Sequence, residues 1–262
     1  MRSLRTVAVT RYVTPLREGG SVPAIVEADD EGMYVLKFRG AAQGPKALVA
    51  ELLAGEIGRA ADLPVPEIVL IQLDPDLART EPDPEIQDLI RASGGLNVAL
   101  DYLPGAVTFD PVIHRPAPAL ASAVVWFDAF VSNVDRTARN TNMLMWHRQL
   151  HLIDQGAALY FHHAWDARYL ERSHDPFARI SEHVLLPFAT ALPEAHESML
   201  ERLTPQIMHA LVALIPDALL PGDSTFATPA EQRSAYQRYL LRRLEPPHEF
   251  FTEALRAHAQ LV

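Results

Sequence analysis

The segment "SNVDRTARNTNMLMW", residues 132–146, is a short polar stretch enclosed by apolar sequence. It follows the apolar run APALASAVVWFDAFV, residues 117–131, and it ends in the apolar letters MLMW. Its polar side chains include Asp135, Asn140 and Asn142. Aspartate and asparagine are common in turns, because their side chains hydrogen-bond to the nearby backbone. They also supply the oxygen ligands that Mg²⁺ prefers, so the surrounding chain must decide between a simple turn and a loop that handles phosphate and metal.

The sequence just downstream predicts a β-hairpin that ends in an aspartate. MLMWH and LHLID are typical of two short strands joined by a tight turn at Arg148–Gln149. The second strand ends at Asp154, which is followed two positions later by glycine, so its carboxylate can project into a cleft. We therefore expect Asp154 to converge with the aspartate and one asparagine of the polar loop. Such a set of oxygens suits Mg²⁺ and leaves room for phosphate oxygens.

The first hundred residues predict mainly β structure with one long helix. Pro45 begins a helical pattern that runs to about Ala61, where the letters LPVP end it. A polar insertion at 74–93 predicts at most a short helix. Alternating apolar residues and turn signals predict strands in this part of the chain at 5–13, 24–28, 33–38, 67–73 and 95–103.

The second part of the chain predicts mainly helices. Residues 117–131 form an apolar helix, and from about residue 176 helical spacing is interrupted repeatedly by proline. We therefore expect an α+β fold of two lobes. A nucleotide-binding lobe would cover 1–102 and a helical catalytic lobe 103–262, with the joint near Asp101–Gly105.

Two charged residues of the first part are candidates for a functional ion pair. Lys37 lies in the otherwise apolar strand MYVLKF, where a lysine protects a sheet edge or else reaches a nucleotide phosphate. Glu51 lies on the helical face with Ala47, Ala54 and Gly58, and small residues allow a helix to approach a sheet closely. If a glutamate of this helix pairs with Lys37, Glu51 is better placed than its neighbours, although an exposed glutamate is the ordinary alternative.

A glycine pair offers a weaker signal. Gly19 and Gly20 join the first two strands, and most such pairs are only turns. Here the loop precedes the lysine strand, so its backbone N–H groups could lie above the same phosphate-binding pocket.

The bulk composition excludes several classes of protein. Of 262 residues, 33 are acidic and 23 are Lys or Arg, and this balance argues against nonspecific nucleic-acid binding. The absence of cysteine excludes disulfides and thiolate metal sites. We see neither a signal peptide nor an apolar run long enough to span a membrane, so we expect a cytoplasmic protein.

The ordered set of motifs resembles the protein-kinase-like superfamily, and HipA-like kinases most closely. The resemblance rests on "YVLKF", "AELLAGEIGRAADLPVP", "LDYLPGA", "VSNVDRTARNTNML" and "LHLIDQG", over roughly residues 5–165. The polar loop is also similar to the D-R-x-x-x-N loop of phosphoinositide kinases. The resemblance implies that Lys37 holds the phosphates of ATP, Glu51 orients Lys37, Asp135 is the catalytic-loop base, and an asparagine with Asp154 binds Mg²⁺.

The sequence departs from the kinase pattern at several places. DQG replaces DFG, the arginine follows the aspartate instead of preceding it, and the glycine loop is short. Asn140 lies at the usual spacing after the loop aspartate, but Asn142 leads directly into the apolar strand, so both remain candidates and Asn142 is favoured. At the joint, the resemblance implies nucleotide contacts by Asp101 and Leu103.

These features together predict an ATP- and Mg²⁺-dependent kinase that phosphorylates a hydroxyl group, on a protein if it acts as HipA-like kinases do. A pseudokinase or nucleotide-binding regulatory module is one alternative. A small-molecule phosphotransferase of the aminoglycoside-kinase type is another, because "DYLPG" occurs in such a hinge. The pair His162–His163 is more typical of a polar cleft wall than of a metal site, because no third ligand is evident.

Overall fold

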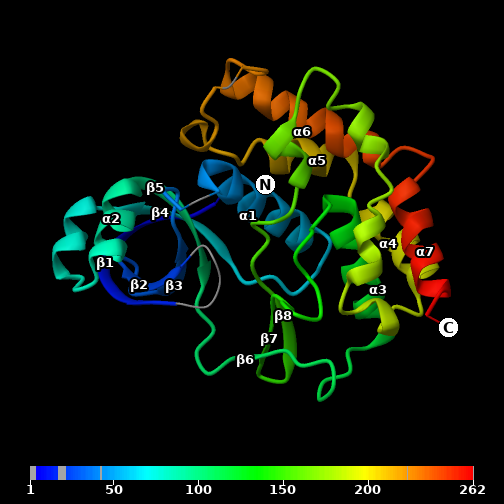
Figure 1. The fold of residues 1–262 in the computed structure, drawn as a ribbon, viewed down its shortest axis with the longest axis horizontal. Coiled ribbons are helices and arrows are strands. Elements are labelled where there is room, and N and C mark those ends of the chain that lie inside the picture. Colours follow the sequence, from blue (N-terminus) through cyan, green and yellow to red (C-terminus); the bar gives the residue numbers. More distant parts are fainter. Residues whose placement is uncertain (1–3, 17–21, 42, 223, 262) are drawn as a thin grey trace.

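The computed structural model describes residues 4–16, 22–41, 43–222 and 224–261. A β-rich part with one flanking helical insertion lies on the left in Figure 1, and a mainly helical part lies on the right. Helix α1 (Gly44–Ala60) lies between them. Gly19 and Gly20, which we predicted to lie above the nucleotide, fall outside the described residues.

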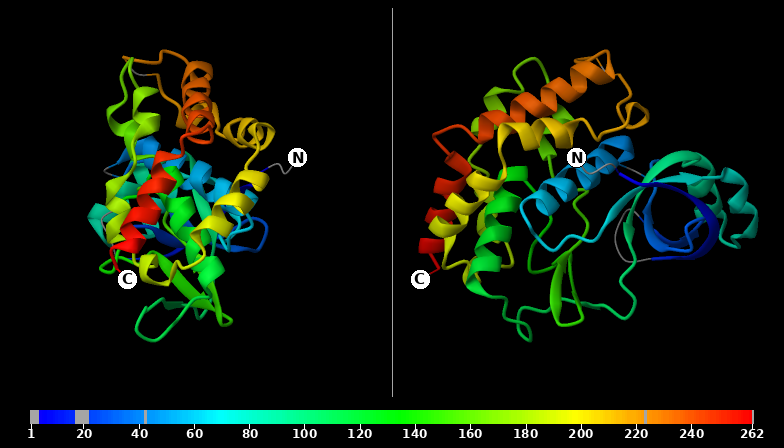
Figure 2. Two further views of the ribbon diagram at one scale, coloured as in Figure 1. Left: turned by 90° about the vertical axis from the view of Figure 1, so that its right-hand side faces the viewer. Right: turned by 180° about the vertical axis from the view of Figure 1, so that it is seen from behind.

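Five strands of the N-terminal part close into a barrel in the order β1-β2-β3-β5-β4 (Figure 2, right). β1 and β4 pair in parallel, and the other neighbours are antiparallel. Buried aliphatic and aromatic residues, among them Val26, Leu36 and Ile71, fill the barrel. The strands are β1 (Thr6–Pro15), β2 (Ala24–Ala28), β3 (Met33–Lys37), β4 (Ile68–Leu73) and β5 (Gly95–Asp101).

The position of β3 in the sheet decides which way the side chain of Lys37 points. β3 lies between β2 and β5, so Lys37 does not protect a sheet edge. Tyr34 and Leu36 face the barrel interior. Lys37 pairs in register with Val98, which belongs to the core on the α1 side of the sheet. Alternation along the strand therefore turns Lys37 towards α1.

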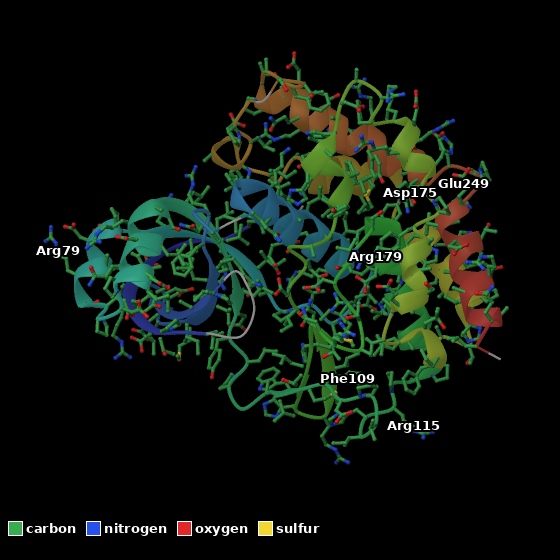
Figure 3. The ribbon with its side chains drawn as sticks, in the orientation of Figure 1. Arg79, Phe109, Arg115, Asp175, Arg179 and Glu249 are labelled. Carbon is green, nitrogen blue, oxygen red and sulfur yellow. The ribbon has the colours of Figure 1, made fainter. Side chains whose placement is uncertain are left out.

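The polar insertion folds as two short helices at the outer end of the barrel. η1 (Pro75–Thr80) is a 3₁₀ helix, and α2 (Pro84–Ala92) is an α-helix. Asp74 and Asp83 cap them by accepting hydrogen bonds from backbone N–H groups, and a proline follows each cap. Figure 3 shows Arg79 at this outer edge, far from the helical part of the molecule.

Helix α1 belongs to the core of the helical part as well as to the sheet. Small residues permit close packing, because a Cβ on Gly55 would lie 2.3 Å from Ile68 of β4. Its apolar residues share one core cluster with those of α3 (Pro118–Val131) and α5 (Pro205–Val212). At its C-terminal end, Arg202 donates to the carbonyl oxygen of Ala61 at 3.0 Å. The helix that carries Glu51 is therefore fixed to the C-terminal helices.

A small three-stranded sheet connects the barrel to the helices. It has the order β6-β7-β8, with strands β6 (Val107–Thr108), β7 (Met143–Trp146) and β8 (Gln149–Leu152). The predicted hairpin is β7–β8, whereas β6 was not predicted because two residues carry no periodic signal. Trp146 donates to the carbonyl oxygen of Pro104 at 3.0 Å, which ties the hairpin to the segment that follows the barrel.

The remaining chain packs helices around α3. Buried Trp126, Phe127 and Phe130 on α3 contribute to the main core. Thr228 and Glu231 form a reciprocal capping box at the start of α6. Besides α5, the helices are α4 (Leu192–Arg202), α6 (Pro229–Arg243) and α7 (Glu249–Ala259), with 3₁₀ segments η2 (Tyr160–Ala164), η3 (Glu171–His174), η4 (Ala178–Glu182), η5 (Leu186–Phe188) and η6 (Asp217–Leu219).

The structure confirms an α+β architecture with a β-rich N-terminal sheet and a mainly helical C-terminal region. The barrel strands end at Asp101, close to the predicted joint, whereas the division into lobes at 102 and 103 stays a prediction. Within the described ranges, no helix has the length and apolar character needed to cross a bilayer.

Candidate active site

Lys37 lies between two carboxylates that come from different elements. Its Nζ is 2.8 Å from Oδ1 of Asp154, just after β8, and 3.7 Å from Oε2 of Glu51 on α1. Lys37 and Glu51 are 9% and 1% exposed. Three residues far apart in the sequence thus meet between the barrel, α1 and the hairpin. Their roles in a functional site stay a prediction.

Burial and charge act in opposite directions on these three groups. Burial disfavours the ammonium of Lys37, but the two carboxylates outweigh it and raise its pKa. Burial also disfavours the carboxylate of Asp154, yet the charge and hydrogen bond of Lys37 lower its pKa. For Glu51, burial raises the pKa, and Lys37 offsets this only in part.

The carboxylate of Glu51 is weakly partnered within this cluster. Neither of its oxygens accepts a hydrogen bond of ordinary length and angle from the described residues. The backbone N–H groups of Gln155 and Gly156 lie close enough to favour its charged form. A Cβ on Gly156 would lie 3.6 Å from Glu51 Oε2 and 3.5 Å from Asp154 Oδ1, so this glycine lies against both carboxylates.

Asp135 lies at the start of the polar loop, and two asparagines hold it in place. Its Oδ2 accepts hydrogen bonds from Nδ2 of Asn140 at 2.7 Å and from Nδ2 of Asn142 at 3.2 Å. Asn142 is 9% exposed, whereas Asn140 lies on the surface. No described residue donates a hydrogen bond to the other carboxylate oxygen, Oδ1, which leaves it available to a hydroxyl group.

The hairpin brings Asn142 and Asp154 to the same end of two paired strands. The N–H of Ile153 donates to the carbonyl oxygen of Asn142 at 3.0 Å, beyond the Met143–Leu152 register pair. Asn142 and Asp154 both adopt the left-handed conformation, with φ of 47° and 56°. Asparagine and aspartate enter this conformation more readily than other residues that carry a side chain, because their short polar groups can bond nearby.

The comparisons with known proteins now identify the family. The family described as HipA-like kinase matches residues 9–253, which is most of the chain. The chain belongs to the HipA-like kinase family. No curated protein sequence matches the chain.

Two of the solved structures that this HipA-like chain resembles are kinases. The match to the Helicobacter pylori proinflammatory kinase CtkA has 12% sequence identity and a TM-score of 0.62, and it covers 99% of each of the two chains. The match to the Golgi casein kinase with Mn/ADP bound has 10% sequence identity and a TM-score of 0.51. It covers 98% of this chain and 74% of the casein kinase chain. At such identities the likeness shows the fold alone, and that fold is kinase-like.

The predicted hinge residues of this HipA-like chain lie at the end of β5 and just after it. Asp101 is exposed as a whole residue at the end of β5, but partial burial of its carboxyl group raises its pKa, with a further contribution from Glu67. Leu103 is 7% exposed. Within the described residues, no hydrogen bond or ion pair joins either residue to Lys37, Asp135 or Asp154. Their nucleotide contacts stay a prediction.

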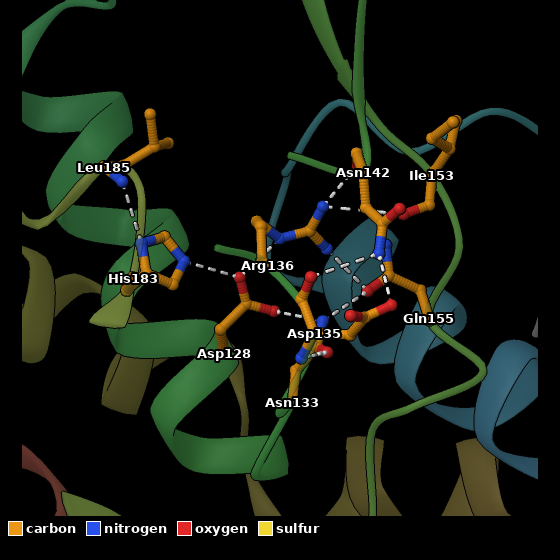
Figure 4. A network of polar contacts seen from close by, with 9 residues as sticks. All are labelled: Asp128, Asn133, Asp135, Arg136, Asn142, Ile153, Gln155, His183 and Leu185. Atoms are coloured by element: carbon orange, nitrogen blue, oxygen red, sulfur yellow. Dashed lines mark hydrogen bonds and ion pairs between the residues drawn. The ribbon is translucent and has the colours of Figure 1, made fainter. Parts of the chain in front are cut away.

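A buried polar network beneath the loop was not predicted from the sequence (Figure 4). Arg136 donates to Asp128 of α3 at 2.6 Å, to Oε1 of Gln155 at 2.8 Å, and to the carbonyl oxygen of Asn142. His183 completes the network, because its Nε2 is 2.9 Å from Oδ2 of Asp128. Two features of the sequence could have pointed to this network: the lone acidic residue in an apolar helix and the glutamine of DQG.

The neighbours of Asp128 favour its carboxylate form despite complete burial. Burial opposes its charge, but Arg136 and His183 together lower its pKa. Asn133 donates to its second oxygen at 2.9 Å. Asp128 thus holds the start of the polar loop and Arg136 at once.

The histidine pair forms part of a different contact. Nδ1 of buried His162 lies 2.9 Å from the hydroxyl of Tyr236, and its Nε2 lies 3.2 Å from Nε2 of His163. Lys46 of α1 donates to the carbonyl oxygen of His162 at 2.6 Å. Within the described ranges, no three His, Asp or Glu side chains group as a metal site. That the histidines form a polar wall stays a prediction.

Proposed function

We propose that this chain is an ATP- and Mg²⁺-dependent kinase that transfers the γ-phosphoryl group of ATP to a hydroxyl group on a protein. One observation carries the proposal. Lys37 is held between Glu51 and Asp154, while Asp135, on the adjoining loop, presents an oxygen to which no described residue donates a hydrogen bond. A cation for phosphate, a carboxylate for metal and a carboxylate for a hydroxyl are the three parts that phosphoryl transfer needs.

The donor set near the hairpin fits Mg²⁺. Asp154 offers carboxylate oxygens, and no described residue donates a hydrogen bond to the amide oxygen of Asn142. Both are hard oxygen ligands, and Mg²⁺ binds such a pair together with water and phosphate oxygens. Bound there, Mg²⁺ would neutralise negative charge on the phosphates.

The residues of the chain then divide the work of the transfer. Lys37 holds the nucleotide phosphates, and Glu51 keeps its side chain directed towards the cleft. Asp135 orients the acceptor hydroxyl and accepts its proton as the new oxygen–phosphorus bond forms. The bond between the γ-phosphorus and the bridging oxygen breaks, and ADP leaves with that electron pair.

The comparisons support this proposal without deciding the substrate. Family membership favours phosphotransferase chemistry. A structural relative was crystallised with Mn/ADP, which supports a nucleotide and a divalent cation in this fold. A protein acceptor is proposed because of the HipA-like family, and a small-molecule acceptor is the competing choice.

A binding measurement followed by a transfer measurement tests the proposal. We expect ATP with Mg²⁺ to raise the unfolding temperature of the wild type more than either component alone, and radiolabel from γ-labelled ATP to reach a protein acceptor. Asp154→Ala should remove the Mg²⁺-dependent part of both signals while the fold is kept. Binding without any transfer to proteins or small molecules would identify a pseudokinase instead, and a well-folded Asp154→Ala variant with full transfer would contradict the metal assignment.

A further inference from the structure

We propose that Arg136 is a positioning residue that fixes the proposed base Asp135 relative to the proposed metal ligand Asp154. The inference rests on the proposed function, because it concerns two residues of that site. Arg136 touches neither carboxylate in its hydrogen bonds. Its hydrogen bonds go instead to the backbone and side chains of their neighbours.

The contacts of Arg136 enclose Asp154 from both sides. One guanidinium nitrogen, Nη1, donates to the carbonyl oxygen of Ile153 at 3.5 Å, and the other, Nη2, donates to Oε1 of Gln155 at 2.8 Å. These are the residues immediately before and after Asp154. Arg136 itself directly follows Asp135, so one side chain spans the short distance between the two functional segments (Figure 4).

The same guanidinium holds the end of the polar loop. Its Nη1 donates to the carbonyl oxygen of Asn142, which also accepts the N–H of Ile153 at 3.0 Å. Asn142 and Asp154 are the two left-handed residues at this end of the hairpin. Arg136 therefore bonds to the backbone at or next to both left-handed positions and favours their orientation.

The guanidinium is itself fixed from the side of α3. Its Nε donates to Oδ2 of Asp128 at 2.6 Å, and both side chains are fully buried. His183 and Asn133 hold the same carboxylate, so the anchor has little freedom. Only arginine offers a planar set of donors that reaches an acid, an amide and two carbonyl groups at once.

The contact with Arg136 gives a physical reason for glutamine at the position where the DFG motif of kinases has phenylalanine. Gln155 is fully buried, and its Oε1 is bound by Arg136 and lies 3.5 Å from Nδ2 of Asn133. An apolar side chain at this position would leave one arm of the guanidinium without an acceptor inside the protein, which is unfavourable. Gln155 and Arg136 thus act as one unit.

The test is Arg136→Lys, which keeps the charge next to Asp128 but cannot span the other acceptors. We expect a folded protein that binds ATP without Mg²⁺ as the wild type does. The gain in ATP affinity on adding Mg²⁺ should fall by about 10-fold, and transfer per folded molecule by about 10²-fold, because small misplacements of reacting groups cost that much. The matched control is Arg233→Lys, since Arg233 also donates to a backbone carbonyl, that of Ile215 at 2.9 Å, but lies on α6.

Two further variants keep the proposal open to refutation. If Arg136→Lys does not fold, Arg136→Met combined with Asp128→Asn removes both buried charges and serves in its place. Gln155→Met should reduce the Mg²⁺-dependent gain in ATP affinity by less than Arg136→Lys does. The double variant should lose less than the sum of the losses of the two single variants.

The Mg²⁺-dependent affinity separates this inference from the proposed function, because it needs no acceptor. A wild type that binds MgATP but transfers nothing defeats the proposed kinase activity and leaves the positioning test intact. Wild-type Mg²⁺ dependence in folded Arg136→Lys overturns the inference. Equal loss of ATP affinity with and without Mg²⁺ also overturns it, because that result marks a purely structural role.

Discussion

The two polar clusters of the site differ in how completely they are bonded. Around Lys37, the contacts are one ion pair at 2.8 Å and one at 3.7 Å, and both oxygens of Glu51 lack a hydrogen bond of ordinary geometry from the described residues. Around Arg136, the guanidinium bonds to an acid, an amide and two carbonyl groups. We therefore expect the first cluster to rearrange around a phosphate, and the second to keep the surrounding backbone fixed.

The chemistry of the two cations accounts for this difference. Lysine carries a compact charge on a flexible stem, so it can exchange a carboxylate for a phosphate with little rearrangement. Arginine has a rigid planar set of donors and keeps a fixed geometry when all of them are bonded. Lys37 is 9% exposed and Arg136 only 1%, in keeping with these roles.

The two clusters should differ most in how much the loss of their cation lowers the stability of the protein. Arg136→Met would leave the buried carboxylate of Asp128 without its cation, and we expect it to lower the free energy of unfolding by about 3–5 kcal/mol. Lys37→Met should cost clearly less, because Glu51, whose pKa is already raised by burial, can take up a proton. Urea unfolding of both variants measures this, and equal losses would remove the distinction between the clusters.

A double-mutant cycle sharpens the description of the Lys37 cluster. Lys37→Ala and Glu51→Ala should each reduce phosphoryl transfer, and the double variant should lose less than the sum, since each change already removes the shared contact. The expected coupling is about 0.5–3 kcal/mol in activation free energy. Strictly additive losses would show that Glu51 does not orient Lys37.

The two asparagines allow a finer comparison within the loop. Asn142→Ala should weaken the Mg²⁺ dependence of ATP binding more than Asn140→Ala does. Asn142 is buried beside the hairpin, and its Nδ2 lies 3.2 Å from Oδ2 of Asp135, whereas Asn140 is exposed. ATP titrations with and without Mg²⁺ measure the difference. The reverse order would move the metal ligand to Asn140 and leave the kinase proposal standing.

The smallest effect concerns a histidine outside both clusters. His196 accepts the indole N–H of Trp126 at 2.8 Å, and burial, with a contribution from His248, lowers its pKa to about 4. In the unfolded chain, the imidazole of His196 has the ordinary histidine pKa of about 6.5 and takes up a proton below that pH. The stability contribution of neutral His196 is therefore complete above pH 6.5 and is lost as the pH falls towards 4.

Thermal unfolding across this pH range checks the assignment. The wild type should lose stability on acidification, and His196→Gln should show a shallower decline. Buried His162 has a lowered pKa as well, so part of the slope should remain in the variant. An unchanged slope in His196→Gln would show that His196 does not contribute.

The sequence predicted those parts of the site that lie on regular, periodic elements. Lys37 at the end of a strand, Glu51 on the small face of a helix and Asp154 after a hairpin could be placed because each has a local pattern around it. The packing of α1 against α5 could not be predicted, since it joins residues about 150 positions apart.

The buried network escaped prediction for a related reason. Asp128 is a single acidic residue in an apolar helix, and nothing in its local sequence names a partner. Its partners, Arg136 and His183, lie in two irregular segments whose positions depend on the whole fold. Pairing between a helix and irregular segments has no periodic signature, so only the three-dimensional structure reveals it.

The central claim is that Asp135 acts on an acceptor hydroxyl while the rest of the site holds MgATP. The most direct measurement is single-turnover transfer from γ-labelled ATP by Asp135→Asn, alongside its MgATP affinity. This nearly isosteric change should leave the affinity close to that of the wild type and slow transfer by about 10²-fold or more, as expected for loss of a positioned acid–base group. Full transfer by Asp135→Asn would show that the loop is not catalytic and would contradict the account.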